Sequence, residues 1–182
     1  MRNSKILSTA NISLMTVIII LCGWITLPAP VPFTMQTFGI YAAVLLLGSK
    51  DALISVALYI LLGLAGVPVF SGFASGLGHL LSPTGGYILG FLLCPLVSLL
   101  GEKLYRKKSQ TLLLLSAGTL LCYASGTLWF MAYTNQSDPL AGLWSALLTC
   151  VLPYLVPDAL KLFAAYFLAK KLKPKLRKLN KE

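Results

Sequence analysis

Long apolar stretches separated by short polar connections make up most of this chain. A membrane-spanning helix needs about 20 mainly apolar residues, and most of the stretches approach that length. In the last stretch, Pro153 and Pro157 predict a division into a short surface helix at 140–152 and a span that begins at Pro157. We therefore predict six spans. They lie near residues 8–27, 37–49, 51–66, 86–104, 110–133 and 157–172.

The composition predicts the same environment. Hydrophobic residues make up 57% of the chain and charged residues only 11%, whereas a soluble domain is typically about 25% charged. Such a chain has too little polar surface to cover itself in water. We therefore expect an all-α membrane protein that forms a single transmembrane domain over residues 1–182.

The basic residues predict the orientation of the spans. All but one of the 15 Lys and Arg residues lie before the first span, after the last span, or in the connections that contain Lys50 and residues 103–108. The other three connections contain none, so the positive-inside rule places both termini in the cytoplasm and Gly76 outside. The net charge of +10 then reflects membrane topology and contacts with membrane lipid. Nucleic-acid binding is not expected, because no basic patch is interleaved with exposed aromatic residues.

The exception is Lys161, which lies within the sixth span three residues after Asp158. A charge at membrane depth costs about 2.5–3.5 kcal/mol on insertion scales, and such residues usually face a bundle interior or an aqueous cavity. Residues at this spacing share one helix face. We interpret the pair as a polar ligand site at the outer end of the span, with a purely structural ion pair as the alternative.

Two uncharged outer connections are expected to cover such a site. The segment SGFASGLGHLLSPTGGYILGF, Ser71 to Phe91, holds six glycines and no Asp, Glu, Lys or Arg. Irregular backbone at membrane depth survives only where protein buries it or a cavity receives it. We predict that this segment is a lid over an outward-facing pocket, with a plain loop as the alternative. The connection TLPAPVPFTMQTF adds Thr34 and Gln36, two neutral hydrogen-bonding side chains.

Small residues recur at every fourth position in the fourth and fifth predicted spans. Such ridges allow membrane helices to pack closely. We interpret them as internal packing surfaces, with a docking face for another subunit as the alternative. The residues are Gly86, Gly90, Cys94 and Ser98 in one span, and Gly118, Cys122 and Gly126 in the other.

The residues offer little for catalysis or metal binding. The four cysteines occur singly within apolar runs, which does not indicate a zinc site or a disulfide framework. An enzyme would need an activated nucleophile with a positioned base, or paired carboxylates, but Asp158 is the one acid within an apolar run away from a connection, and His79 is the one histidine. A phosphate-binding G-x-x-x-x-G-K-[ST] loop is also lacking. We therefore expect no enzyme activity, metal or cofactor.

Several segments together resemble a known family. VPFTMQTF, GLAGVPVFSGF, SPTGGYILGF and PDALK are similar to the BioY family, the biotin-specific S components of energy-coupling-factor (ECF) vitamin transporters. The likeness runs from about Leu27 to Lys171, and PTGGY combined with P-D-x-x-K is its most specific part. The resemblance implies a six-helix S-component bundle with lid loops between helices 1 and 2 and helices 3 and 4. It also implies capture of biotin from outside, together with a transmembrane coupling subunit and two ABC-type ATPases.

The resemblance also implies a set of site residues. Asp158 and Lys161 would contact the biotin headgroup, whose ureido ring offers two N–H donors and one carbonyl acceptor. Their neighbours would be Thr34, Gln36, Gly85, Gly86 and Tyr87. Candidates for the apolar wall are Phe33, Phe73, Tyr87 and Tyr154.

The resemblance is not complete, and other functions stay open. Family members often carry alanines at four-residue spacing in the first helix for docking the coupling subunit, whereas this chain offers Thr9 and Ser13. The alternatives are an S component for another small vitamin and a membrane scaffold without a transport function.

Overall fold

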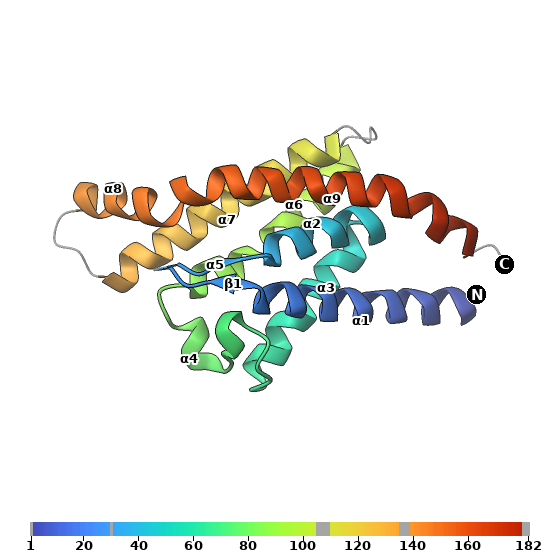
Figure 1. Cartoon of the computed structure of the whole chain (residues 1–182), viewed down its shortest axis with the longest axis horizontal. Helices are drawn as coiled ribbons and strands as arrows, with labels where there is room; N and C mark the ends of the chain where they lie inside the picture. The colour runs from blue at the N-terminus through green and yellow to red at the C-terminus, as the bar shows by residue number, and fades with distance from the viewer. Residues whose placement is uncertain (1, 30, 105–109, 135–138, 180–182) are drawn as a thin grey trace.

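The computed structural model describes residues 2–29, 31–104, 110–134 and 139–179 (Figure 1). The regular structure of these residues is helical, apart from one short antiparallel strand pair. The elements are α1 (Arg2–Trp24), β1 (Thr26–Leu27), β2 (Phe33–Thr34), α2 (Gln36–Leu47), α3 (Ser49–Leu64), the 3₁₀ helix η1 (Ser71–Phe73), α4 (Leu77–Leu80), α5 (Gly85–Gly90), α6 (Leu93–Leu104), α7 (Gln110–Thr134), α8 (Pro139–Cys150) and α9 (Leu152–Leu179).

Several of these helices suit a membrane. Among the described residues, four helical stretches are long and apolar enough to cross a bilayer: Lys5–Trp24, Gly85–Glu102, Gln110–Thr134 and Gly142–Pro174. The second stretch joins α5 to α6, and the fourth joins α8 to α9. Helix α2 is also apolar but has only 12 residues, a length of about 18 Å, against about 30 Å of hydrocarbon. The count of six spans therefore stays a prediction.

Helix α2 lies at the centre of the helical packing. It packs against α1, α3 and α9, and Ile40, Ala43 and Val44 are almost completely buried. A helix that is apolar on all sides is stable only when neighbours cover all sides. The sequence of α2, QTFGIYAAVLLL, has no charged residue, which explains its central position.

The structure confirms that the small-residue ridges are internal packing surfaces. A Cβ on Gly118 of α7 would lie 2.7 Å from Cys94 Cα of α6, and a Cβ on Gly126 would lie 2.2 Å from the ring of Tyr87. A Cβ on Gly90 would meet Cys122 Sγ at 2.9 Å. The two ridges therefore face each other. Because the glycines lack side chains, the helices can approach closely at these positions.

The start of the last helix differs from the prediction. Helix α9 begins at Leu152 and continues through Pro157, so the expectation that the last span begins at Pro157 is wrong. Proline within a helix removes one backbone hydrogen bond and costs about 3 kcal/mol. The preceding turn is held in place by Tyr154, whose buried side chain donates a hydrogen bond to the Val31 carbonyl oxygen. The short helix expected at 140–152 is present as α8.

The connection between α1 and α2 also contains structure that the sequence did not indicate. Strands β1 and β2 pair in antiparallel register, with Thr26 opposite Thr34 and Leu27 opposite Phe33. The chain therefore leaves α1, turns back as a hairpin and enters α2 at Gln36.

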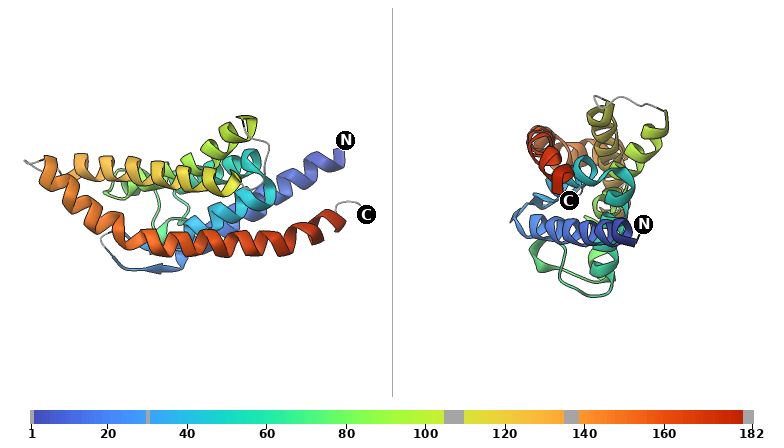
Figure 2. Two further views of the ribbon diagram at one scale, coloured as in Figure 1. Left: turned by 90° about the horizontal axis from the view of Figure 1, so that it is seen from above. Right: turned by 90° about the vertical axis from the view of Figure 1, so that its right-hand side faces the viewer.

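The elements divide between two ends of the molecule. The N-terminus, the junction of α2 with α3, the start of α7 and the C-terminal part of α9 lie toward one end, whereas the β-hairpin, α4 and α8 lie toward the other (Figures 1 and 2). The segments at the first end include the N-terminal part of α1 with Lys5, the start of α3 with Lys50 and the C-terminal part of α9 with Lys170. The segments expected to cover a site are thus gathered at the end that lacks these lysines.

Candidate functional site

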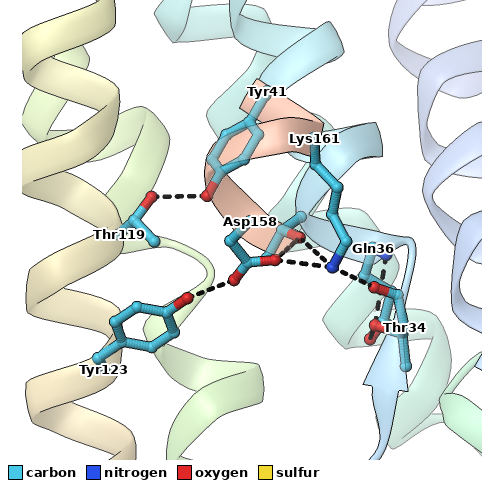
Figure 3. Close-up of polar contacts among 8 residues, drawn as sticks. Thr34, Gln36, Tyr41, Thr119, Tyr123, Asp158 and Lys161 are labelled. Atoms are coloured by element: carbon cyan, nitrogen blue, oxygen red, sulfur yellow. Dashed lines mark hydrogen bonds and ion pairs between the residues drawn. The ribbon is translucent and has the colours of Figure 1, made fainter. Parts of the chain in front are cut away.

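Helix α9 carries two buried charges one turn apart. Lys161 Nζ lies 2.7 Å from Asp158 Oδ1, and each residue is 6% exposed (Figure 3). Because α9 packs along α2, these side chains point into the bundle. A buried charge is tolerated only when it is paired and hydrogen-bonded. The hydrogen-bond partners of each group therefore determine whether it has capacity left to bind a ligand.

The Lys161 ammonium group has three hydrogen-bond partners, which matches its three N–H donors. It donates to Asp158 Oδ1, to the Thr34 carbonyl oxygen at 2.7 Å and to Thr37 Oγ1 at 3.2 Å. Nζ also lies 4.0 Å from the centre of the Phe33 ring, a distance at which a cation is attracted to the ring face. The hairpin and the start of α2 thus hold Lys161 in place.

The Asp158 carboxylate connects three helices. Oδ1 accepts hydrogen bonds from Lys161 of α9 and from Thr37 Oγ1 of α2 at 2.9 Å. Oδ2 accepts one from the Tyr123 hydroxyl of α7 at 2.5 Å. Neither Thr37 nor Tyr123 was predicted from the sequence. A weak signal for Tyr123 was its place one residue after Cys122 of the small-residue ridge, where α7 meets its neighbours.

A second polar group lies beside the pair. Thr34 Oγ1 donates to Gln36 Oε1 at 3.0 Å, and Gln36 Nε2 donates to the Tyr59 hydroxyl of α3. Gln36 fits against Gly23 of α1, where a Cβ would lie 2.8 Å from Nε2. The five side chains of this group and the ion pair are all at least nine-tenths buried: Thr34, Gln36, Tyr59, Asp158 and Lys161.

These groups line one side of a cavity of about 70 Å³. The other walls are mainly aromatic and aliphatic, and the hairpin and the glycine-rich segment also contribute residues. The polar lining includes Thr34, Gln36, Thr37, Asp158 and Lys161; the aromatic and aliphatic lining includes Ile88, Phe91, Tyr87, Tyr123 and Tyr154; the hairpin contributes Val31 and Pro32, and the glycine-rich segment contributes Ser71 and Thr84.

Four residues expected at the site do not line this cavity, and Phe73, Gly85 and Gly86 are three of them. Phe73 is 62% exposed and its ring lies 4.9 Å from that of Trp24. Gly85 and Gly86 serve close packing instead: a Cβ would lie 1.6 Å from the Leu80 carbonyl oxygen at Gly85 and 2.2 Å from Trp129 Cβ at Gly86. Ligand contact by these three residues stays a prediction that the described contacts do not favour. Phe33 lies under Lys161 and also lies outside the lining.

Stacked aromatic rings hold the glycine-rich segment against the C-terminal end of α3. The Phe70 ring is fully buried and occupies the space that a side chain on Gly63 would need, since a Cβ there would lie 2.1 Å from it. His79 stacks on Phe70 with ring centres 5.2 Å apart, and burial lowers the pKa of its imidazole. Phe70 in turn meets Tyr59 edge-on at 5.6 Å, and Tyr59 binds Gln36. The segment is thus coupled to the site through ring contacts.

Comparisons with known proteins agree on one family. The family model described as BioY family matches residues 1–178. The probable biotin transporter BioY of Pyrococcus horikoshii is 38% identical over 143 residues, which covers 79% of this chain and 81% of that protein. The biotin transporter BioY of Thermotoga maritima is 37% identical over 162 residues, covering 87% and 90%.

A solved structure has the same arrangement of helices. The crystal structure of an S-component for biotin from an ECF-type ABC transporter superimposes with a TM-score of 0.81 at 28% sequence identity. The match covers 96% of this chain and 94% of that one.

The hydroxyl of Tyr123 should stabilise the buried carboxylate. In Tyr123→Phe, Asp158 Oδ2 loses its donor, and a hydrogen bond to a charged group contributes about 1.5–3 kcal/mol. We expect a clearly lower thermal unfolding temperature in detergent. Tyr133→Phe removes an exposed hydroxyl from the same helix and should have little effect. Equal unfolding temperatures for the two variants would show that the Tyr123 contact does not support the pair.

Proposed function

This chain belongs to the BioY family and is a biotin transporter, the S-component of an ECF-type ABC transporter, and on this basis we propose that it captures biotin from outside in the cavity beside Asp158 and Lys161. It is a substrate-binding component of a transporter and not an enzyme. The observation that most supports this site is the buried ion pair, whose two charges border a largely apolar cavity.

The chemistry of the pair suits a ureido ring. A carboxylate oxygen can accept about two hydrogen bonds, and Asp158 Oδ2 accepts a single one among the described residues, so it can accept a ligand N–H as well. The longest hydrogen bond of Lys161 is that to Thr37, at 3.2 Å. The ureido carbonyl oxygen can replace Thr37 Oγ1 as the acceptor of this ammonium N–H. Such charge-assisted hydrogen bonds are among the stronger ones in proteins.

The remainder of biotin is mostly hydrocarbon and needs an apolar wall. Tyr87, Phe91 and Tyr154 supply one opposite the charged residues. Ligand pockets usually measure about 300–1,000 Å³, against about 70 Å³ here, so entry of biotin requires an outward movement of the cover. The hairpin turn at Val31 and the segment at Ser71 form the outer lining, and we infer that these two connections are the lids that open and close.

We expect the purified protein to bind biotin with one-to-one stoichiometry. Isothermal titration in detergent should give a saturable heat at micromolar biotin, and a diamine derivative with an opened ureido ring should bind far more weakly. A panel of other small vitamins serves as the control. A folded preparation that gave no heat with biotin, or that bound another vitamin more tightly, would contradict the proposed substrate.

We also propose that the chain crosses the membrane six times with both termini in the cytoplasm. This proposal is supported by the positive-inside rule and by the location of both termini at one end of the molecule (Figure 1). It requires the short helices α2 and α3 to cross as part of the bundle, which is feasible because protein covers most of α2. The expected cytoplasmic residues Arg106, Lys107, Lys108 and Lys181 lie outside the described residues.

Cysteine labelling tests this topology. Gly76 has φ +85°, so a side chain there is strained, but Gly78 is exposed and its added Cβ would meet nothing within 4 Å. In intact cells a membrane-impermeant maleimide should label Gly78→Cys, whereas Lys50→Cys should react only after permeabilisation. The native cysteines are buried, which keeps the background low. Labelling in the reverse pattern would refute the orientation.

A transmembrane coupling subunit and two ABC-type ATPases are the proposed partners. Thr9 and Ser13 are exposed on α1, where family members often carry alanines. Their hydroxyl groups donate to carbonyl oxygens of the same helix, at Lys5 and Thr9 respectively. Because these hydroxyls are satisfied locally and the side chains are small, this face of α1 still allows another helix to approach closely.

A further inference from the structure

A second cavity, of about 290 Å³, opens between α7 and α9, and none of the residues that line it belongs to the hairpin. Helix α8 joins these helices at one end (Figure 2), but α7 packs mainly on α5 and α6, whereas α9 packs mainly on α2. The small side chains of Ser116 and Ala159 leave room between them. We call this cavity the α7–α9 groove.

The rims of the groove are apolar and face outward. Leu113 and Leu120 of α7 are 70% and 60% exposed, and Phe163 of α9 is 56% exposed. Both helices belong to stretches apolar enough to cross a bilayer. In a membrane protein the groove is therefore continuous with the lipid-facing surface.

The floor of the groove is polar but offers few open hydrogen-bonding groups. Tyr41 and Thr119 share a hydrogen bond of 2.8 Å, and Tyr123 donates to Asp158. With these hydroxyl groups already engaged, a polar solute would gain little by entering. A hydrocarbon chain loses nothing, because it needs only contact with the leucine walls.

Basic residues continue the groove face of α9 toward the C-terminus. Lys170 follows Phe163 by seven residues and Lys173 follows Ala159 by fourteen, and both spacings are close to whole helical turns. Both lysines are exposed, and the sequence has no acidic residue from Leu162 to Lys181. Lys170 lies about 10 Å beyond Phe163 along the helix, a suitable distance for a headgroup at the membrane surface.

From these features we propose that the α7–α9 groove binds an anionic phospholipid. One acyl chain lies between Leu120 and Phe163, and Lys170 and Lys173 bind the phosphate headgroup. This acyl chain packs against Tyr123 and Asp158 from the side opposite the smaller cavity. It thereby helps to hold the hydrogen bond between these two residues in place. Basic residues between membrane helices are a common means of lipid recognition.

Native mass spectrometry of the full chain in detergent can test this site with two probes, phosphatidylglycerol and phosphatidylcholine carrying identical dioleoyl chains. The wild type should bind one phosphatidylglycerol at saturation and prefer it over phosphatidylcholine by about fivefold for each lysine. Lys170→Gln with Lys173→Gln should abolish the preference. The control variant, Lys50→Gln with Lys171→Gln, removes the same amount of charge elsewhere and should retain the preference for phosphatidylglycerol.

Filling the groove tests the acyl-chain position. Ala159→Phe should reduce retention of both lipids severalfold, whereas Ala164→Phe, on the opposite exposed face of the same helix, should not. If Ala159→Phe does not fold, Ser116→Leu fills the groove from α7. Equal retention in the groove and control variants, binding without saturation, or a change of oligomeric state in place of lipid loss would each overturn the proposal.

The effect on biotin is a separate readout and rests on the proposed function. Removal of the bound lipid should weaken biotin binding severalfold, and adding back phosphatidylglycerol should restore it. If lipid retention follows the expected pattern but no preparation binds biotin, the proposed substrate fails and the lipid site stands. Unchanged biotin affinity in the delipidated protein would overturn only the coupling to Tyr123 and Asp158.

Discussion

The ion pair between Asp158 and Lys161 is the constraint on which the rest of the structure depends. Two charges buried in a membrane protein are costly unless nearly every donor and acceptor is matched. The matching groups come from several elements: Thr34 at the end of β2, Thr37 in the first turn of α2, Tyr123 of α7, and the two residues of α9 themselves. Satisfying this pair therefore fixes where the hairpin ends and how α7 and α9 approach the centre.

The apolar packing makes that arrangement possible. Because α2 lacks charge and is covered on most sides, its first turn can lie at the middle of the bundle and present Thr37 to Asp158. The glycines of α5 and α7 bring Tyr87 and Tyr123 to the same cavity. Breaks in regular structure also contribute: the chain leaves β2 at Thr34, which frees that carbonyl oxygen to accept from Lys161.

Much of this arrangement could be predicted from the sequence, because the relevant residues are unusual for their setting. A lysine and an aspartate within an apolar run, an uncharged glycine-rich connection, and small residues at four-residue spacing each have few physical explanations. Thr37 and Tyr123 could not be identified, since their role depends on which faces of α2, α7 and α9 meet. The course of α9 through Pro157 was missed for the same reason: tertiary contacts of Tyr154 outweigh a local preference. Gly85 and Gly86 were matched by motif, but the structure gives them packing contacts.

The most direct measurement is the affinity of the Asp158→Asn/Lys161→Met double variant for biotin, taken together with its thermal unfolding temperature. Replacing both charges at once removes the pair without stranding either partner, so the double variant should be more stable than either single variant. If the pair holds the ureido group, this stable protein should bind biotin more than about 100-fold more weakly than the wild type, since two hydrogen bonds to charged groups are lost. Near-wild-type affinity in a stable double variant would contradict the site and leave the pair with a structural role alone.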